Sequence, residues 1–127
     1  MTFPGLIIWR AGGDLFFSSV GHFEDGLRTA LATESSVTRQ VLLDADSVDF
    51  IDTSACDALL KTITELRNRE ITVAFARVRD DVRDRMRLGG IEAVVGSANF
   101  YERVTDGVRT WQEQIQAVDQ DNSGTSL

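Results

Sequence analysis

The sequence has very few of the residues that build metal centres and disulfide bridges. It contains one cysteine, one histidine and one proline among 127 residues. Cys56 has no second cysteine with which to form an internal disulfide, and with His22 as the only histidine a tetrahedral zinc site lacks ligands. We therefore expect a protein of a reducing compartment and predict no metal site.

Lysine and long apolar runs are also scarce. All 13 basic residues except Lys61 are arginines, and Lys61 follows Leu60 in a helical pattern, so the glycine–lysine pair of a phosphate-binding P-loop is absent. Apolar runs such as Leu6–Trp9 are far shorter than the roughly 18 residues that span a bilayer. Because no secretory leader opens the chain, we expect it, as given, neither to cross a membrane nor to carry a secretion signal.

Positive charge is in the minority, with 13 basic against 20 acidic side chains and a net charge of -7. Such a field repels phosphate backbones, so general nucleic-acid binding is disfavoured. Hydrophobic residues make up 43% and charged residues 26%, which is typical of a globular protein with one core. We predict one domain over residues 1–116 and a flexible polar tail over 117–127.

The start of the chain predicts a hairpin followed by a helix. The strand formers of Leu6–Trp9, the turn signal Gly12–Asp14 and the apolar Leu15–Phe17 together predict an antiparallel hairpin. An amphipathic helix is predicted over residues 20–32, because apolar side chains recur there at four-residue spacing: Phe23, Leu27 and Leu31.

The middle of the chain carries the clearest signals. Val41–Leu43 is a compact apolar run that ends at Asp44, as expected of a strand buried on both faces. Asp52–Ser54 consists of three residues of the type that caps helices, and it predicts the start of the next helix. The helical spacing continues behind this cap at Ala55, Leu59, Ile63 and Leu66.

The last part repeats the order of strand and helix. Ile71–Ala76 predicts a strand, and the next helix opens at Asp80–Asp81 and closes at Gly89–Gly90. A brief strand is predicted at Ala93–Val95. A final helical stripe comprises Phe100, Val104, Val108, Trp111 and Ile115. The pattern predicts an α/β fold, a mixed sheet with helices packed against it.

Two stretches resemble a known family. VLLDADSVDFIDTSACDALLKTITEL, with the strand and helix that end at Gly89–Gly90, resembles the core of a STAS domain, the fold shared by SulP anion transporters and bacterial anti-sigma-factor antagonists. The opening PGLIIWRAGGDLFFSSVGHF resembles the SulP variant, in which a strand leads into a Leu-Phe-Phe hairpin. The resemblance covers most of the chain and implies a STAS-type mixed sheet of four to five strands with about four helices.

The resemblance also implies a function. The chain is then a non-enzymatic regulatory and interaction domain of a SulP-type transporter of sulfate or a related anion, at the cytoplasmic face of the plasma (inner) membrane. Its implied partner is the transmembrane domain of the same transporter, with further protein partners, and the natural chain would extend before Met1. Two alternatives stay open: a stand-alone partner-switching protein like the anti-sigma-factor antagonists, and a nucleotide-binding sensor.

The implied regulatory site is the cap at Asp52, Thr53 and Ser54. Antagonists carry two serines here followed by glycine, and the second serine accepts phosphate; Ser54 takes that place, Thr53 takes the first, and Ala55 replaces the glycine. Free backbone amides at a helix start stabilise added negative charge. The alternative is plain capping, which is worth about 1 kcal/mol.

An arginine-rich segment suggests a second site. Arg77 and Arg79 follow a predicted strand, at the edge where ligands of open sheets usually bind. With Ser54 they are our candidates for a weak anion or nucleotide site, for GTP or ATP, an activity that the resemblance implies. The alternative is a solvated helix with acidic residues at its start and basic ones at its end. The full charged set is Arg77, Arg79, Asp80, Asp81, Arg83, Asp84, Arg85 and Arg87.

The predicted hairpin supplies an interaction surface at Phe16, Phe17, Ser18 and Ser19. The SulP variant often has asparagine after the paired phenylalanines, where this chain has serine. The alternative for the aromatic rings is a place in the core.

Three further features have simpler interpretations. His22 beside serines and aspartates lacks a G-x-S-x-G pattern, so a hydrolytic triad is disfavoured. Cys56, one turn into a helix, is expected to be a small buried apolar residue. The acidic series lacks the glycine and terminal glutamate of a calcium loop, and turn chemistry explains it; it comprises Asp44, Asp46, Asp49, Asp52 and Asp57.

Overall fold

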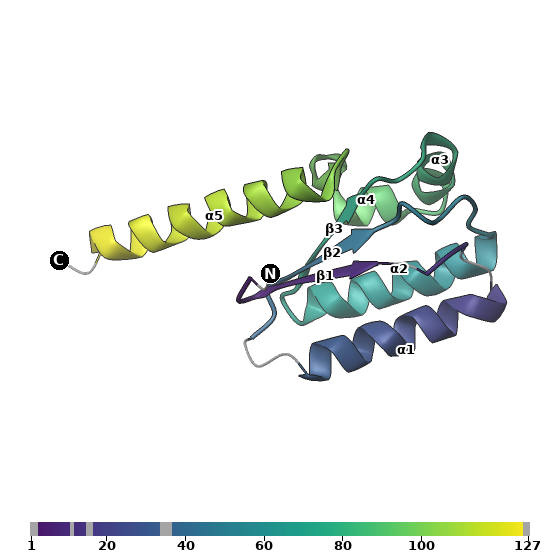
Figure 1. Cartoon of the computed structure of the whole chain (residues 1–127), viewed down its shortest axis with the longest axis horizontal. Coiled ribbons are helices and arrows are strands. Elements are labelled where there is room, and N and C mark those ends of the chain that lie inside the picture. Colours follow the sequence, from purple (N-terminus) through teal and green to yellow (C-terminus); the bar gives the residue numbers. More distant parts are fainter. Residues whose placement is uncertain (1–2, 11, 15–16, 34–36, 126–127) are drawn as a thin grey trace.

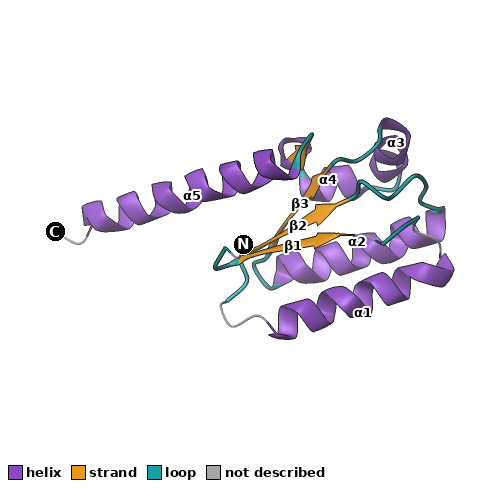
Figure 2. Ribbon diagram, viewed as in Figure 1, coloured by secondary structure: helices purple, strands orange, loops and turns teal. Residues whose placement is uncertain are grey.

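The chain forms a four-stranded sheet with helices on both faces (Figures 1 and 2). The computed structural model describes residues 3–10, 12–14, 17–33 and 37–125. The strands lie in the spatial order β1-β2-β3-β4, and every neighbouring pair is parallel. The α/β class predicted from the sequence is confirmed. The strands are β1 (Leu6–Arg10), β2 (Gln40–Asp44), β3 (Thr72–Ala76) and β4 (Phe100–Tyr101).

The helices form two unequal layers. In Figure 1, α1 and α2 lie side by side along one face of the sheet, while α5 starts against the other face and extends past it toward the C-terminus. α5 passes the domain boundary predicted at residue 116, and the flexibility of 117–127 stays a prediction. The helices are α1 (Phe17–Thr33), α2 (Thr53–Asn68), α3 (Asp80–Leu88), α4 (Ile91–Val95) and α5 (Val104–Thr125), with a short 3-10 helix at Ser97–Asn99.

Strand β2 is buried over its whole length, as its apolar run predicted, because both of its faces are covered. Alternate side chains enter different cores. Val41 and Leu43 pack in the larger core, which α1 and α2 cover, whereas Leu42 packs with Trp111 of α5 in the smaller one. The sheet therefore separates two apolar clusters, and β2 contributes side chains to both.

The predicted antiparallel hairpin is wrong. Phe17 lies in the first turn of α1, and β1 pairs with β2 in parallel; residues 15–16 lie outside the described part. Parallel neighbours need a crossover connection, which α1 supplies. Beside the glycine turn, the Ser19 hydroxyl donates to the carbonyl oxygen of Asp14 at 3.3 Å, so this turn leads into a helix rather than a second strand.

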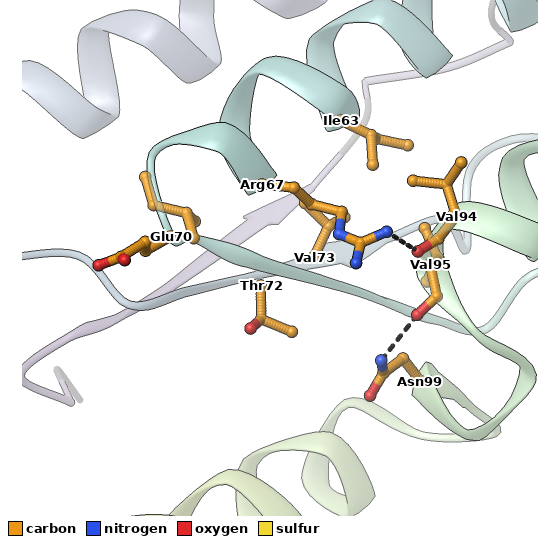
Figure 3. A pocket seen from close by; sticks show the side chains of 9 residues that line it. Ile63, Arg67, Glu70, Thr72, Val73, Val94, Val95 and Asn99 are labelled. Atoms are coloured by element: carbon orange, nitrogen blue, oxygen red, sulfur yellow. Dashed lines mark hydrogen bonds between the residues drawn. The ribbon is translucent and has the colours of Figure 1, made fainter.

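The strand predicted at Ala93–Val95 is also wrong, since these residues belong to α4. Side chains from other elements satisfy the end of this short helix (Figure 3): Arg67 donates to the Val94 carbonyl at 2.7 Å and Asn99 to that of Val95 at 2.8 Å. These bonds border a cavity of about 210 Å³ at the amino edge of β3. Phe100, predicted in the final helix, instead belongs to edge strand β4.

The contact between α1 and α2 contains a carboxylate. Glu24 accepts a hydrogen bond from the Thr62 hydroxyl, and its side chain is only 12% exposed. Burial raises the pKa of Glu24; nearby Arg28 opposes this, while Glu65 and Asp25 add to it. The stability of the chain should thus fall as the pH rises through this raised pKa, because ionised Glu24 is disfavoured in the folded state.

We expect Glu24→Gln to raise the free energy of unfolding at pH 7 by up to about 1 kcal/mol, because glutamine keeps an acceptor for Thr62 and carries no charge. Urea denaturation of the parent chain and the variant at pH 4 and pH 7 measures this difference in the free energy of unfolding. Glu113→Gln, at an exposed position of α5, is the matched control and should leave stability unchanged. An equal loss of stability at both pH values in the Glu24 variant would contradict this account.

Candidate functional site

The first turn of α2 begins where the sequence predicted. Asp52 is the N-cap in an extended backbone conformation, and its Oδ1 accepts a hydrogen bond from the Ala55 amide at 2.7 Å. The Asp52 carbonyl accepts from the Cys56 amide at 2.9 Å. Because Asp52 supplies the cap, the exposed side chains of Thr53 and Ser54 are not the capping groups. Their regulatory role stays a prediction.

A hollow of about 160 Å³ lies beside this turn, between α2 and the end of α3. Thr53, Arg85 and Leu88 are among the residues that line it. Leu88 is 86% exposed and Phe50 36% exposed, and the Arg85 guanidinium lies 4.8 Å from the centre of the Phe50 ring. We call this hollow the α2–α3 groove; it is lined by Ile51, Asp52, Thr53, Cys56, Asp57, Arg85, Leu88 and Gly89.

A glycine allows the two helices to meet at the groove. A Cβ atom at Gly89 would lie 2.4 Å from Cys56 Sγ, so any side chain there would push α3 away. Cys56 itself is 3% exposed, which confirms the buried apolar role expected of it. Burial, with a smaller contribution from Asp57, raises the pKa of the Cys56 thiol, so it stays protonated and unreactive at neutral pH.

The carboxyl edge of the sheet holds an ion pair between a buried aspartate, Asp44, and an arginine, Arg77, whose side chain is 38% exposed. Arg77 donates to Asp44 through two nitrogens, Nε to Oδ1 at 3.1 Å and Nη2 to Oδ2 at 2.8 Å. The Asp44 side chain is 8% exposed. Arg77 adopts φ 59°, a left-handed conformation that is uncommon for residues with a side chain, and its amide donates to the Tyr101 carbonyl at 3.0 Å. The backbone is therefore held so that the guanidinium meets Asp44.

Other charges at this edge are also balanced. Arg79 pairs with Asp49 at 2.7 Å, and Asp46 lies 3.7 Å from Arg10 and 3.8 Å from Arg77. The structure thus directs Arg77 and Arg79 to the acidic series that follows β2. The nucleotide site predicted for Ser54, Arg77 and Arg79 stays a prediction, and a phosphate there would compete with these carboxylates.

We expect Asp44→Ala to lower the free energy of unfolding at pH 7 by about 1–3 kcal/mol, because it removes charge-assisted hydrogen bonds. Burial by itself raises the pKa of Asp44, but the bonds from Arg77 and the Asp46 amide, with the charges of Arg77 and Arg10, lower it overall from 3.8. The pair therefore stabilises the fold above pH 3.8, and this contribution is lost as the pH falls through the lowered pKa. Urea denaturation between about pH 2 and pH 6 measures how this contribution to the free energy of unfolding depends on pH.

Asp49→Ala is the matched control, because the Asp49–Arg79 pair is largely exposed and worth less than about 1 kcal/mol. If both variants lost the same stability at pH 7, or if Asp44→Ala kept the acid dependence of the parent chain, the Asp44–Arg77 pair would not stabilise the fold in this way.

Three of the four remaining predicted site residues lie at the start of α1. Phe16 falls outside the described residues, whereas Phe17, Ser18 and Ser19 form the first turn of that helix. Their predicted role as an interaction surface stays a prediction. Within the described part of the chain, no three side chains of His, Cys, Asp or Glu gather closely enough to hold a metal ion.

Sequence reasoning missed the exposed part of the groove. Arg83 pairs with Glu92 at 3.3 Å and Arg87 with Asp84 at 2.8 Å. Arg85 is thus the one arginine between residues 77 and 87 for which the described residues supply no carboxylate partner. Its spacing four residues after Asp81 would have suggested a paired, solvated side chain, so no sequence signal distinguished it.

Comparison with known proteins identifies the family to which this fold belongs. The family model for the STAS domain matches residues 2–107. The chain belongs to the STAS domain family. The STAS-type fold expected from the resemblance is thereby confirmed.

The curated relatives are transporters. "Sulfate transporter 4.1, chloroplastic" of Arabidopsis thaliana is 26% identical over 125 residues, which cover 91% of this chain and 18% of the relative. A probable sulfate transporter of Mycobacterium tuberculosis is 27% identical over 111 residues, 87% of this chain and 20% of the relative. The chain spans about a fifth of the length of these relatives. In the described residues, no helix combines the length and apolar character that crossing a bilayer requires.

Solved structures share the fold. The STAS domain of a SulP transporter from Vibrio cholerae superposes with a TM-score of 0.76 at 22% identity, covering 91% of this chain and 88% of that one. The murine solute carrier 26 family member A9 anion transporter, in the inward-facing state, gives a TM-score of 0.80 at 18% identity, covering 89% of this chain and 18% of that one. In the second case a domain of this fold is one part of a complete transporter.

Proposed function

We propose that the chain is the regulatory STAS domain of a SulP-type transporter of sulfate or a related anion, placed at the cytoplasmic face of the membrane. The observation that carries the proposal is the family match over residues 2–107, in a chain that spans about a fifth of relatives named sulfate transporters. Transport itself would take place in the part of the protein outside these residues.

The proposed mechanism is coupling through the first turn of α2. The exposed Thr53 and Ser54, together with the α2–α3 groove, dock on the membrane part of the transporter or on a protein partner and bias its conformational equilibrium. Phosphate on Ser54 or Thr53 would add negative charge beside the amides of the first turn and change the docking face. Asp52 caps this turn through its bond with the Ala55 amide, so capping does not need the hydroxyls of Thr53 and Ser54.

The reading frame that encodes the chain tests the assignment. We expect it to continue upstream of Met1 into ten or more apolar segments, each long enough to cross a bilayer. A frame that begins at Met1 and lies beside a kinase gene would instead support the partner-switching alternative and overturn the transporter assignment.

The nucleotide hypothesis has a separate test. Titration of GTP or ATP into the chain should shift the backbone amide resonances of Ser54, Arg77 and Arg79 if these residues bind the phosphates. Unchanged spectra at millimolar nucleotide would overturn the nucleotide hypothesis. Because both arginines already pair with aspartates, we expect any nucleotide binding to be weak.

A further inference from the structure

The cavity at the amino edge of β3 combines an apolar floor with a guanidinium on its wall. It has a volume of about 210 Å³ and is bordered by the end of α2, the start of β3 and the end of α4. Ile63, Val73 and Val95 are buried and form part of its floor. Since a water molecule takes up about 30 Å³ in the liquid, the cavity has room for about seven heavy atoms.

Arg67 has hydrogen-bonding capacity that the described residues leave unused. Its Nη1 donates to the Val94 carbonyl at 2.7 Å, and this bond holds the guanidinium at the wall of the cavity. The remaining N–H groups of a guanidinium can bind a carboxylate through two parallel hydrogen bonds. None of the described residues offers Arg67 a carboxylate partner, whereas Arg77 and Arg79 at the opposite edge of the sheet are both paired.

Two further polar side chains lie around the same space (Figure 3). The Asn99 amide nitrogen donates one hydrogen to the Val95 carbonyl at 2.8 Å and carries a second. Thr72 contributes a hydroxyl from the exposed start of β3. Glu70 also lines the cavity, but in Figure 3 its carboxylate points away from the Arg67 guanidinium. The wall therefore offers donors to an anionic head group, and the floor suits an aliphatic tail.

We propose that this cavity binds a small monocarboxylate with a short branched aliphatic chain. The carboxylate pairs with Arg67, and the chain displaces water from the apolar floor. One guanidinium balances one negative charge, whereas a dianion such as sulfate would leave its second charge unpaired beside Glu70 and the apolar floor. The cavity lies at the end of α2 that is opposite to its first turn, so this inference does not depend on the proposed docking face.

Titration of 3-methylbutanoate, which has about the size of the cavity, into the isotope-labelled 127-residue chain at neutral pH tests the proposal. We expect shifts of the backbone amide resonances of residues 70–73 and 94–99, which border the cavity. Acetate should bind at least about tenfold more weakly, because each buried methylene strengthens binding about three- to fourfold. The uncharged 3-methylbutanamide should also bind at least about tenfold more weakly, because it lacks the charge that pairs with Arg67.

Arg67→Gln should weaken the binding of 3-methylbutanoate about tenfold or more, since glutamine keeps an N–H group for the Val94 carbonyl but carries no charge. Arg69→Gln is the matched control: Arg69 is exposed at the same end of α2 but does not line the cavity, so this variant should bind as the parent chain does. Circular dichroism checks that both variants fold. The comparison of the three ligands needs no substitution, so it tests the proposal even if Arg67→Gln fails to fold.

Four results would overturn the inference. Unchanged spectra at about 50 mM 3-methylbutanoate would show that the cavity takes no such ligand. Equal binding of the carboxylate and the amide would exclude the pair with Arg67, and equal binding of acetate or sulfate would exclude the role of the apolar floor. Shifts confined to residues 53–57 would place the ligand at the other end of α2. Each of these results would leave the proposed function intact, because the upstream reading frame decides that assignment separately.

Discussion

Leu42→Ala is expected to lower the free energy of unfolding by about 2–5 kcal/mol, the range typical of removing a fully buried leucine side chain. Leu42 is fully buried at the centre of the smaller core, between β2 and α5. Because α5 contributes Trp111 to this cluster, truncation of Leu42 leaves a cavity directly beneath the helix. Chemical denaturation followed by tryptophan fluorescence measures the loss.

A second substitution makes this prediction specific. Gly107 of α5 lies so close that a Cβ atom there would be 2.9 Å from Leu42 Cδ2 and 3.2 Å from the Tyr101 ring. Gly107→Ala should therefore destabilise the parent chain, although alanine favours helices more than glycine does. In the Leu42→Ala background the same methyl group enters the new cavity, so it should cost nothing or restore part of the stability.

Val37→Ala is the control, because Val37 is 81% exposed and its loss should change stability by less than about 0.5 kcal/mol. Strict additivity of the Leu42 and Gly107 substitutions would contradict the contact between α5 and the sheet.

In the full-length protein, Ser54→Asp is expected to change the rate of anion transport about fivefold or more, a typical size for coupling between two sites. The substitution places a charge at the exposed first turn of α2 without disturbing the Asp52 cap. The stability of the chain itself should rise slightly, by about 0.3–1 kcal/mol, because the N-terminus of a helix favours negative charge. Flux of radiolabelled sulfate into vesicles measures the effect.

Thr64→Asp is the matched control. Thr64 is also exposed on α2, but it lies near the other end of the helix, where its hydroxyl donates to the Leu60 carbonyl at 2.9 Å. The control should leave transport unchanged. If both aspartates changed the flux equally, a general charge effect would explain the result, and the first turn of α2 would have no special role.

Much of the fold was predictable because its strongest signals are local. The Asp52 cap, the apolar run of β2 and the glycines after α3 each satisfy a backbone requirement within a few residues, so the sequence shows them directly. α4 shows the opposite case. Val94 favours strands by propensity, but a hydrogen bond from Arg67, distant in sequence, holds it at the end of a helix.

The ion pair between Asp44 and Arg77, at the carboxyl edge of the sheet, could have been predicted from the parallel pairing of β2 and β3. Parallel strands bring their carboxyl ends to one edge of the sheet, so Asp44, the last residue of β2, lies near Arg77, which follows β3. From the sequence we placed Arg77 in an anion site and did not pair it with Asp44, and that site stays a prediction. The exposure of Leu88 and the stacking of Arg85 on Phe50 depend on how α3 packs against α2, which no local pattern reports.

Docking of the groove face is the central claim, and hydrogen–deuterium exchange tests it most directly. The amides of Thr53 and Ser54 lie in the first turn of α2, where intrahelical acceptors are lacking, so they should exchange rapidly in the 127-residue chain. In the full-length transporter, the account predicts slower exchange over residues 50–57 and 85–89, with unchanged exchange over 61–69 at the far end of α2. Equal exchange of residues 50–57 and 85–89 in the chain and in the transporter would contradict it.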